Sequence, residues 1–168
     1  MITFRCTERV RKRFRIHADE REQAPTNRLG DWYANLLNIG RTRWVPCVSE
    51  RSLLPVLVPA RKADFPARFG ESLAAVLGKL GVPDAVAAVE VRESLTWQFG
   101  KTQSRQVLGS MNDFAFCFPW TFRHTDDPVV AAAAMADTPC SPLGMESPDR
   151  VTFSLLGLAG EPRRVFTR

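Results

Sequence analysis

The sequence lacks any hydrophobic run long enough to cross a membrane. Its longest uncharged stretches, among them 114–122, 128–136 and 151–160, are far shorter than the ~20 apolar residues that a transmembrane helix needs. A basic segment follows the first residues, where a secretory leader would have an apolar core and a small-residue cleavage site. We therefore expect a protein without a membrane partner that is located in the cytoplasm.

The sequence also lacks the usual signatures of catalysis and cofactor binding. It contains no P-loop, no dinucleotide-binding glycine turn, no His-Glu-x-x-His helix and no Gly-x-Ser-x-Gly elbow. The four cysteines, Cys6, Cys47, Cys117 and Cys140, form no Cys-x-x-Cys pair and have no histidine at ligand spacing. We expect reduced thiols, no metal site and no cofactor, and neither histidine anchors a catalytic triad.

What is present fits one compact domain. The chain has 168 residues, of which 45% are hydrophobic and 24% charged, and folding at this length buries about 70% of the surface of the unfolded chain. No internal repeat, low-complexity tract or Gly/Ser linker divides the sequence. The patterns below predict an α+β fold in which an antiparallel β-meander packs against several helices, as a single domain over residues 1–168.

The formal net charge of +5 lies entirely in the first 15 residues. Thr7 is suited to cap a short helix in which Val10 and Phe14 are four residues apart. The other positions then form a basic face, which carries Arg9, Arg11, Lys12, Arg13 and Arg15. Such a face either binds an anion, with nucleic-acid phosphate as the obvious candidate, or only keeps the protein in solution.

Strands are predicted from alternating or β-branched segments. Segments 32–39, 43–49 and 53–59 are joined by short polar links, which allow antiparallel neighbours only. Pro46 and Pro55 have no N–H to donate, so each should lie at an edge or a bulge. The predicted strands are 2–6, 32–39, 43–49, 53–59, 95–99 and, after a helical stretch, 151–155.

Helices are predicted from periodic apolar residues and capping signals. Phe69, Leu73 and Leu77 recur every four residues between a candidate cap at Asp64 and Gly81, and we expect this helix to pack on the meander. A second long helix should begin at Thr102 or Ser104 and reach Phe118, ahead of Pro119. The predicted helices are 8–15, 65–80, 83–91, 104–118 and an alanine-rich segment from 128 to before 139.

The first candidate site follows the loop before the meander. Alternation would place Asp31, Tyr33 and Asn35 on one face of a strand. These three would offer a polar and aromatic surface for a base or a sugar, and Arg28 could pair with Asp31 or face a ligand. Glu50, further along, is a candidate residue of the same pocket. The same groups could instead satisfy one another across the sheet.

The second candidate site lies on the helix that begins near Ser104. Arg105, Gly109 and Asn112 share one stripe, and Ser110 and Asp113 lie on the next. A glycine inside a helix costs about 1 kcal/mol relative to alanine, which indicates close approach of another segment or of a ligand. The alternative is a tight helix contact in which Asn112 and Asp113 bind loop backbone.

The same segments carry a resemblance. The motifs are Arg-Leu-Gly-Asp-Trp-Tyr-Ala-Asn-Leu-Leu at 28–37, Ser-Glu-Arg-Ser-Leu-Leu-Pro at 49–55 and Ser-Arg-x-Val-Leu-Gly-Ser-Met-Asn-Asp-Phe at 104–114. Over about residues 4–143 the sequence resembles an uncharacterised family of short bacterial proteins, a domain of unknown function. The resemblance implies no activity, cofactor or partner.

Three functions stay open. The first is a small binding or regulatory domain that contacts nucleic acid, or a protein partner, through the basic helix, with Arg41 or Arg43 beside it. The alternative is a small hydrolase, assisted by Mg²⁺ or Mn²⁺, in which Asp31, Glu50 and Asp113 converge. The third is an interaction domain without a ligand. A single pocket around the candidate residues would favour the enzyme, and scattered positions would favour binding.

Overall fold

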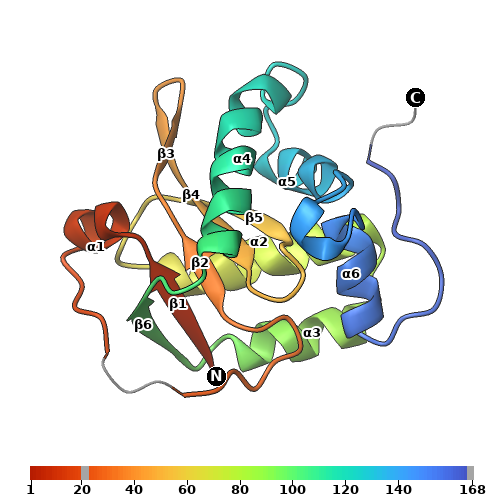
Figure 1. The fold of residues 1–168 in the computed structure, drawn as a ribbon, viewed down its shortest axis with the longest axis horizontal. Coiled ribbons are helices and arrows are strands. Elements are labelled where there is room, and N and C mark those ends of the chain that lie inside the picture. The colour runs from red at the N-terminus through yellow and green to blue at the C-terminus, as the bar shows by residue number, and fades with distance from the viewer. Residues whose placement is uncertain (20–22, 166–168) are drawn as a thin grey trace.

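One six-stranded sheet organises the molecule. We describe it from a computed structural model, which places residues 1–19 and 23–165. Figure 1 shows the arrangement of the elements. In chain order they are β1 (Ile2–Cys6), α1 (Glu8–Phe14), β2 (Trp32–Ala34), β3 (Leu37–Ile39), β4 (Thr42–Ser49), β5 (Pro55–Pro59), α2 (Phe65–Leu80), α3 (Asp84–Glu93), β6 (Trp97–Lys101), α4 (Arg105–Thr121), α5 (Pro128–Ala136), a 3₁₀ turn (Ser141–Leu143) and α6 (Pro148–Leu155).

The predicted antiparallel meander is confirmed for β2 to β5. Strand β4 pairs antiparallel with β2 and β3 along one edge and with β5 along the other. Pro46 lies opposite the break between β2 and β3, where its carbonyl oxygen accepts a hydrogen bond from Asn35 N at 3.1 Å. Pro55 begins β5, which pairs with β4 alone among the described strands. Both prolines thus avoid a ladder position that needs their N–H.

The predicted α+β fold is confirmed, but the sheet as a whole is mixed, because the antiparallel meander is extended by two strands that pair in parallel. Strand β1 pairs in parallel with β2 on one side and with β6 on the other. The short-link argument applies only to neighbours in sequence. Helix α1 and a loop separate β1 from β2, and two helices separate β5 from β6, so these connections are long enough for parallel strands.

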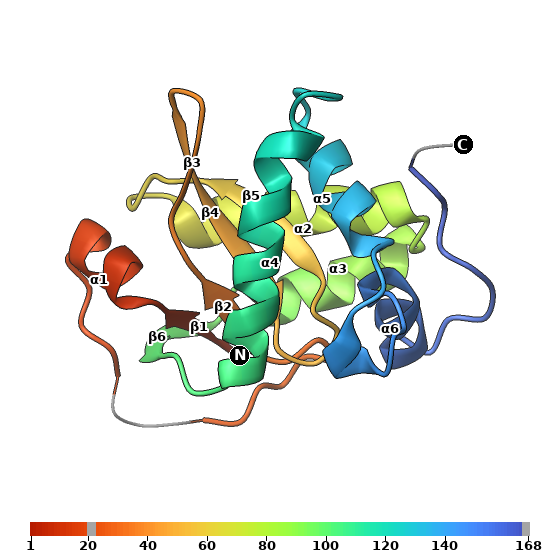
Figure 2. The ribbon, with the colours of Figure 1, turned by 45° about the horizontal axis from the view of Figure 1, so that its top comes forward.

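Each face of the sheet is covered by a helix. Phe4 and Trp32 point to the face covered by α2, where each contacts Phe69 edge-on, with ring centroids 4.9 and 4.8 Å apart. Tyr33, the residue after Trp32 on β2, packs on the opposite face with residues of α4. Figure 2 shows α4 across this face of the sheet. Leu73 and its helical neighbours Phe69 and Leu77 are fully buried, which confirms the predicted α2 packing.

The C-terminal third differs from its prediction in two places. Helix α4 continues to Thr121 with Pro119 inside its last turn, three residues beyond the expected end. Segment 148–155 is the helix α6, so the predicted strand at 151–155 is wrong. Its buried residues include Asp149, Thr152 and Phe153, and this spacing of three and four is helical. No helix among the described residues is both long and apolar enough for a membrane span.

Candidate anion-binding site

Helix α1 is held by its two apolar residues and turns its charges outward. Val10 and Phe14 are buried in the core that α2 covers. Thr7 occupies the cap position, but its hydroxyl donates to Asn35 Oδ1 at 3.0 Å and makes no cap bond to α1. The helix ends at Arg15 in the left-handed conformation, with φ of 50°. Of the basic residues, Arg11 is half-buried, and Arg9, Lys12, Arg13 and Arg15 are exposed.

Two adjoining hollows lie beside this helix, where the parallel strands β1 and β6 end. The larger has a volume of about 650 Å³ and the smaller of about 330 Å³, and Arg11, Ile16 and His17 line both. We refer to them together as the cationic cleft. Its basic lining residues are Arg5, Arg11, Lys12, Arg15, His17 and Lys101, and its acidic ones are Glu8 and Asp19.

Arg5 is held in a buried ion pair with Asp31. Arg5 is 7% exposed, and Asp31 is 1% exposed. Arg5 Nη2 and Nε lie 2.8 and 2.9 Å from Asp31 Oδ2, and Thr3 N donates to Oδ1 at 2.9 Å. Arg5 Nη1 also donates to the Lys101 carbonyl oxygen at 3.3 Å. Asp31 therefore neutralises Arg5 and ties β1 to the segment that precedes β2.

The other cations of the cleft are less compensated. Lys12 contacts Glu8 at 2.7 Å in an exposed pair, and this hydrogen bond lowers the pKa of Glu8. Within residues 1–19 and 23–165, Arg11 and Lys101 have no ion-pair partner, and Arg11 Nε is a buried donor without a hydrogen-bond acceptor. Excess positive charge of this kind attracts anions.

Gly100 lets the two parallel strands approach at the edge of the cleft. A Cβ at this position would stand 2.7 Å from Thr3 Cγ2 on the neighbouring strand β1. Real side chains do not come this close, so glycine is needed for the sheet geometry that places Lys101 next to Arg5.

The first predicted cluster is used for folding. Tyr33 is fully buried, and its hydroxyl accepts a hydrogen bond from Ser104 N at 3.0 Å. Asn35 is half-buried and accepts from Thr7 and from Leu36 N. The expected polar and aromatic surface is therefore wrong, because its tyrosine supports the start of α4 on the inside of the protein.

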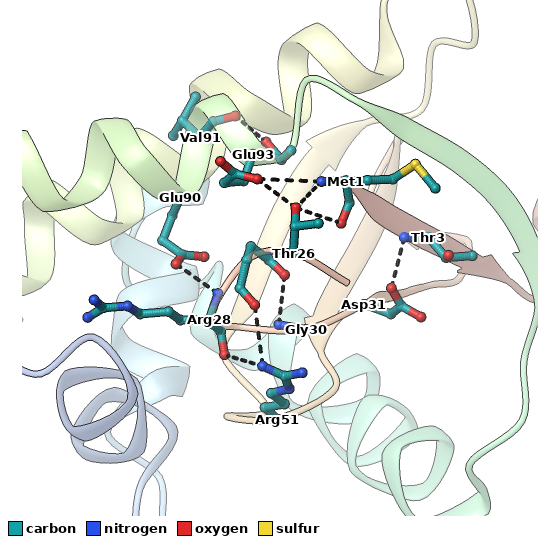
Figure 3. Close-up of polar contacts among 12 residues, drawn as sticks. Met1, Thr3, Thr26, Arg28, Gly30, Asp31, Arg51, Glu90, Val91 and Glu93 are labelled. Carbon is teal, nitrogen blue, oxygen red and sulfur yellow. Dashed lines mark hydrogen bonds and ion pairs between the residues drawn. The ribbon is translucent and has the colours of Figure 1, made fainter. Parts of the chain in front are cut away.

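Arg28 and Glu50 lie apart from that surface as well. Arg28 N donates to Glu90 Oε1 at 3.0 Å, and its Nη1 donates to the Leu156 carbonyl oxygen at 2.6 Å. Glu50 is half-buried, and its backbone N donates to the Asp31 carbonyl oxygen at 2.8 Å. Figure 3 shows Arg28 between α3 and the loop that carries Arg51.

Two of the sequence motifs bind each other. Gly30 has φ of +80°, and its N donates to Asn27 Oδ1 at 3.1 Å. Ser49 Oγ donates to the Leu29 carbonyl oxygen at 2.7 Å. Arg51 Nη1 donates to the Asn27 carbonyl oxygen at 3.3 Å (Figure 3). The residues that make these motifs distinctive thus hold two loops together.

The second cluster is divided between a hollow and solvent. Arg105, Gly109, Ser110 and Asp113 line a hollow of about 520 Å³ between α4 and the segment after α5. Asn112 is exposed and lies outside it. No backbone contact of Asn112 or Asp113 side chains with a loop is present among the described residues, so the expected tight helix contact is wrong.

The nine candidate pocket residues therefore do not surround one cavity. Arg105, Ser110 and Asp113 share the hollow beside α4, and Arg28 lines a separate hollow with Glu90. No group of three His, Cys, Asp or Glu side chains in the described parts of the chain could hold a metal ion. Asp31, Glu50 and Asp113 thus do not converge, and the geometry gives the hydrolase alternative no support.

The residues missed from the sequence are His17 and Lys101. Both line the cationic cleft with Arg11, but neither stands out by motif or charge run. A signal existed in the predicted strand 95–99, since Lys101 follows it by two residues. It could be used only with the knowledge that this strand lies parallel to β1, since parallel strands end at the same edge.

Comparison with known proteins adds one finding. The sequence model of a family described as Domain of unknown function (DUF6933) matches residues 3–151. No curated protein and no solved structure matches the chain.

Proposed function

Because the chain belongs to the DUF6933 family, which assigns no activity to its members, we propose a function from its own geometry: a small domain that binds nucleic acid through the cationic cleft. The observation that carries this proposal is the lining of the two adjoining hollows by Arg11, Lys12, Arg15, His17 and Lys101. These residues come from a helix, the loop after it and the end of a distant strand, and the fold gathers them on one side.

A polyanion suits this cleft better than one small anion. The cations are spread along two hollows that share Arg11 and His17, so successive phosphates of one strand can each meet a different cation. Binding of this kind releases condensed counterions and does not depend on sequence. Arg9 and Arg13 line neither hollow, and they add only to the field around the cleft.

The location proposed for this domain is the bacterial cytoplasm, where nucleic acid is available. The four cysteines are free thiols, and Cys6, Cys47 and Cys140 are buried. Burial raises the pKa of the Cys6 thiol to about 12. Unpaired, unreactive thiols are typical of a reducing compartment.

The test is a fluorescence anisotropy titration with labelled single-stranded and duplex oligonucleotides at low salt. We expect the parent protein to bind, and Arg11→Gln/Lys12→Gln/Arg15→Gln to bind at least about tenfold more weakly. On duplex DNA the affinity of the triple variant should also fall less steeply with salt. The magnitude of the slope of log K against log salt should decrease by up to about 3, since each phosphate contact contributes about 0.9.

The matched control removes the same charge elsewhere. Lys79, Arg92 and Arg123 are exposed and lie outside the cleft, so Lys79→Gln/Arg92→Gln/Arg123→Gln should retain most of the affinity. The proposal is wrong if the parent binds neither oligonucleotide, or if the control loses as much affinity as the cleft variant. In the first case the basic face serves solubility.

A further inference from the structure

The hollow beside α4 is a second site that the cationic cleft does not include. It has a volume of about 520 Å³ and lies between the first three turns of α4 and the segment 138–145, a size common for small-molecule sites. Figure 2 shows this segment beside α4. The hollow shares no lining residue with the cationic cleft, so any ligand that it binds must be recognised by different groups.

The floor of the hollow is open because residue 109 is a glycine. Gly109 lies inside α4, where glycine lowers helix stability relative to alanine. Its φ is not positive, and a Cβ there would meet no atom within 4 Å. Neither backbone conformation nor packing therefore requires glycine. The close approach of another segment is not made within the described chain, and the space over Gly109 is open to the hollow.

Two unpaired charges flank the glycine. Arg105 is one helical turn before Gly109, and Asp113 is one turn after it. All three line the hollow. Among the described residues, neither Arg105 nor Asp113 makes an ion pair or a side-chain hydrogen bond. Asp113 does act on the far wall, where its charge adds to burial in raising the pKa of the Cys140 thiol.

The walls fit an aromatic ring. They include Phe114, Cys117, Met135, Cys140 and Met145. Thioether and thiol sulfur atoms make favourable contacts with aromatic rings, and methionine adapts to the shape of a ligand. A flat ring can lie on the bare backbone at Gly109 and contact the sulfur atoms of the walls. A branched aliphatic group would make fewer of these contacts.

We propose that this hollow binds a guanine base. Guanine presents two acceptors, O6 and N7, on one edge, and these suit the paired donors of an arginine such as Arg105. Its N1–H and N2–H₂ groups are donors, and the ionised Asp113 carboxylate is an acceptor only. Adenine presents an amino donor where guanine has O6. That donor would face the donor groups of Arg105, so adenine fits the hollow less well.

The first experiment is an NMR titration of the intact protein with guanosine and with adenosine. We expect guanosine to shift the Gly109 amide and the methyl signals of Met135 and Met145, and to bind at least about tenfold more tightly than adenosine, which is the effect of one good polar contact. Equal binding of the two nucleosides, or no shift at the hollow, overturns the assignment of guanine.

The decisive variant fills the floor without weakening the fold. Gly109→Leu should abolish guanosine binding while the melting temperature stays equal or rises, since leucine is the better helix former. Asp113→Asn should remove the preference for guanosine over adenosine. In the control Asn112→Leu, the same side chain stands three residues further along α4 and outside the hollow. This variant should bind guanosine as the parent does. Guanosine binding by Gly109→Leu that equals the parent's refutes the proposal.

A further arm separates free nucleoside from guanine within a strand. Oligouridine with one central guanosine is compared with the same oligomer carrying inosine, which lacks the N2 amino group. Tighter binding of the guanosine oligomer, lost in Gly109→Leu, assigns the site to nucleic acid, and binding of guanosine alone assigns it to the free nucleoside. The variant Arg11→Gln/Lys12→Gln/Arg15→Gln should still bind guanosine, so failure of the cleft proposal is distinguishable from failure of this one.

Discussion

The buried ion pair between Arg5 and Asp31 allows one substitution to change stability and anion binding in opposite directions. In Asp31→Asn, the Thr3 N bond can be kept by the amide oxygen, but an NH₂ group must then face the Arg5 guanidinium. Arg5 is 7% exposed, so its guanidinium would lose the buried carboxylate of Asp31, with which it pairs at 2.8 Å. Breaking a buried pair in this way costs about 3–5 kcal/mol, a large part of the roughly 5–15 kcal/mol that stabilises a typical domain.

The assay is urea denaturation followed by tryptophan fluorescence, since the chain has four tryptophans. We expect the free energy of unfolding to fall by about 3–5 kcal/mol, with an unchanged dependence on urea. Below the unfolding transition, the same variant should bind oligonucleotides more tightly, because Arg5 lines the cleft and Asp31 no longer neutralises it. The double variant Arg5→Met/Asp31→Leu removes both charges and should lose less stability than Asp31→Asn. A loss below about 1 kcal/mol in the single variant, or an equal loss in the double variant, refutes this reasoning.

Two further predictions concern the core and the C-terminal helix. Leu73 is fully buried on α2, so Leu73→Ala should lower the free energy of unfolding by about 2–5 kcal/mol through lost burial and a cavity. A loss of less than about 0.5 kcal/mol, as is usual at surface sites, would contradict this packing. Burial raises the pKa of Asp149 above its usual value. The folded state therefore holds the proton more tightly, and stability is lost as pH rises through the window between the usual and the raised pKa. The melting temperature of Asp149→Asn, relative to that of the parent, should accordingly be higher at pH 7 than at pH 3. An identical difference in melting temperature at both pH values would show that the charge of Asp149 does not affect stability.

Local patterns were sufficient for elements with a clear apolar period and clear ends. Helix α2 runs from Phe65 to Leu80 as predicted, since its apolar stripe and the Gly81 stop both point to the same boundaries. Segment 151–155 predicts a strand because Val151, Phe153 and Leu155 alternate, although it belongs to helix α6. The buried residues of α6 include the polar Asp149 and Thr152, so the apolar residues alone do not trace its buried face.

Strand pairing could not be derived from the sequence to the same extent. Alternation identifies a strand and its faces, but it does not identify the neighbour. The parallel pairing of β1 with β6 joins residues almost a hundred positions apart, and it alone brings Lys101 to Arg5. For that reason the sequence could predict a basic helix but not a cleft.

The polar residues of the first motif illustrate why chemistry-bearing side chains are ambiguous in a sequence. Alternation predicts Asp31 and Tyr33 as recognition residues, but both are buried with structural partners, Arg5 and Ser104 N. A buried carboxylate or hydroxyl must be satisfied, and its partner can come from anywhere in the chain. Exposure, not residue type, separates these residues from Arg105 and Asp113.

The two proposed sites follow each other closely along the chain. Lys101 lines the cationic cleft and Arg105 lines the hollow beside α4. Four residues span at most about 14 Å even when fully extended, so the rims of the two sites lie within the reach of a few nucleotides. With both proposed sites occupied by one strand, its phosphates contact the cleft and one of its bases contacts the hollow. In that arrangement the cleft supplies affinity that depends on salt, and the hollow supplies selection of the base. The two contributions can be measured separately, because high salt should weaken the first and leave guanosine binding in the second.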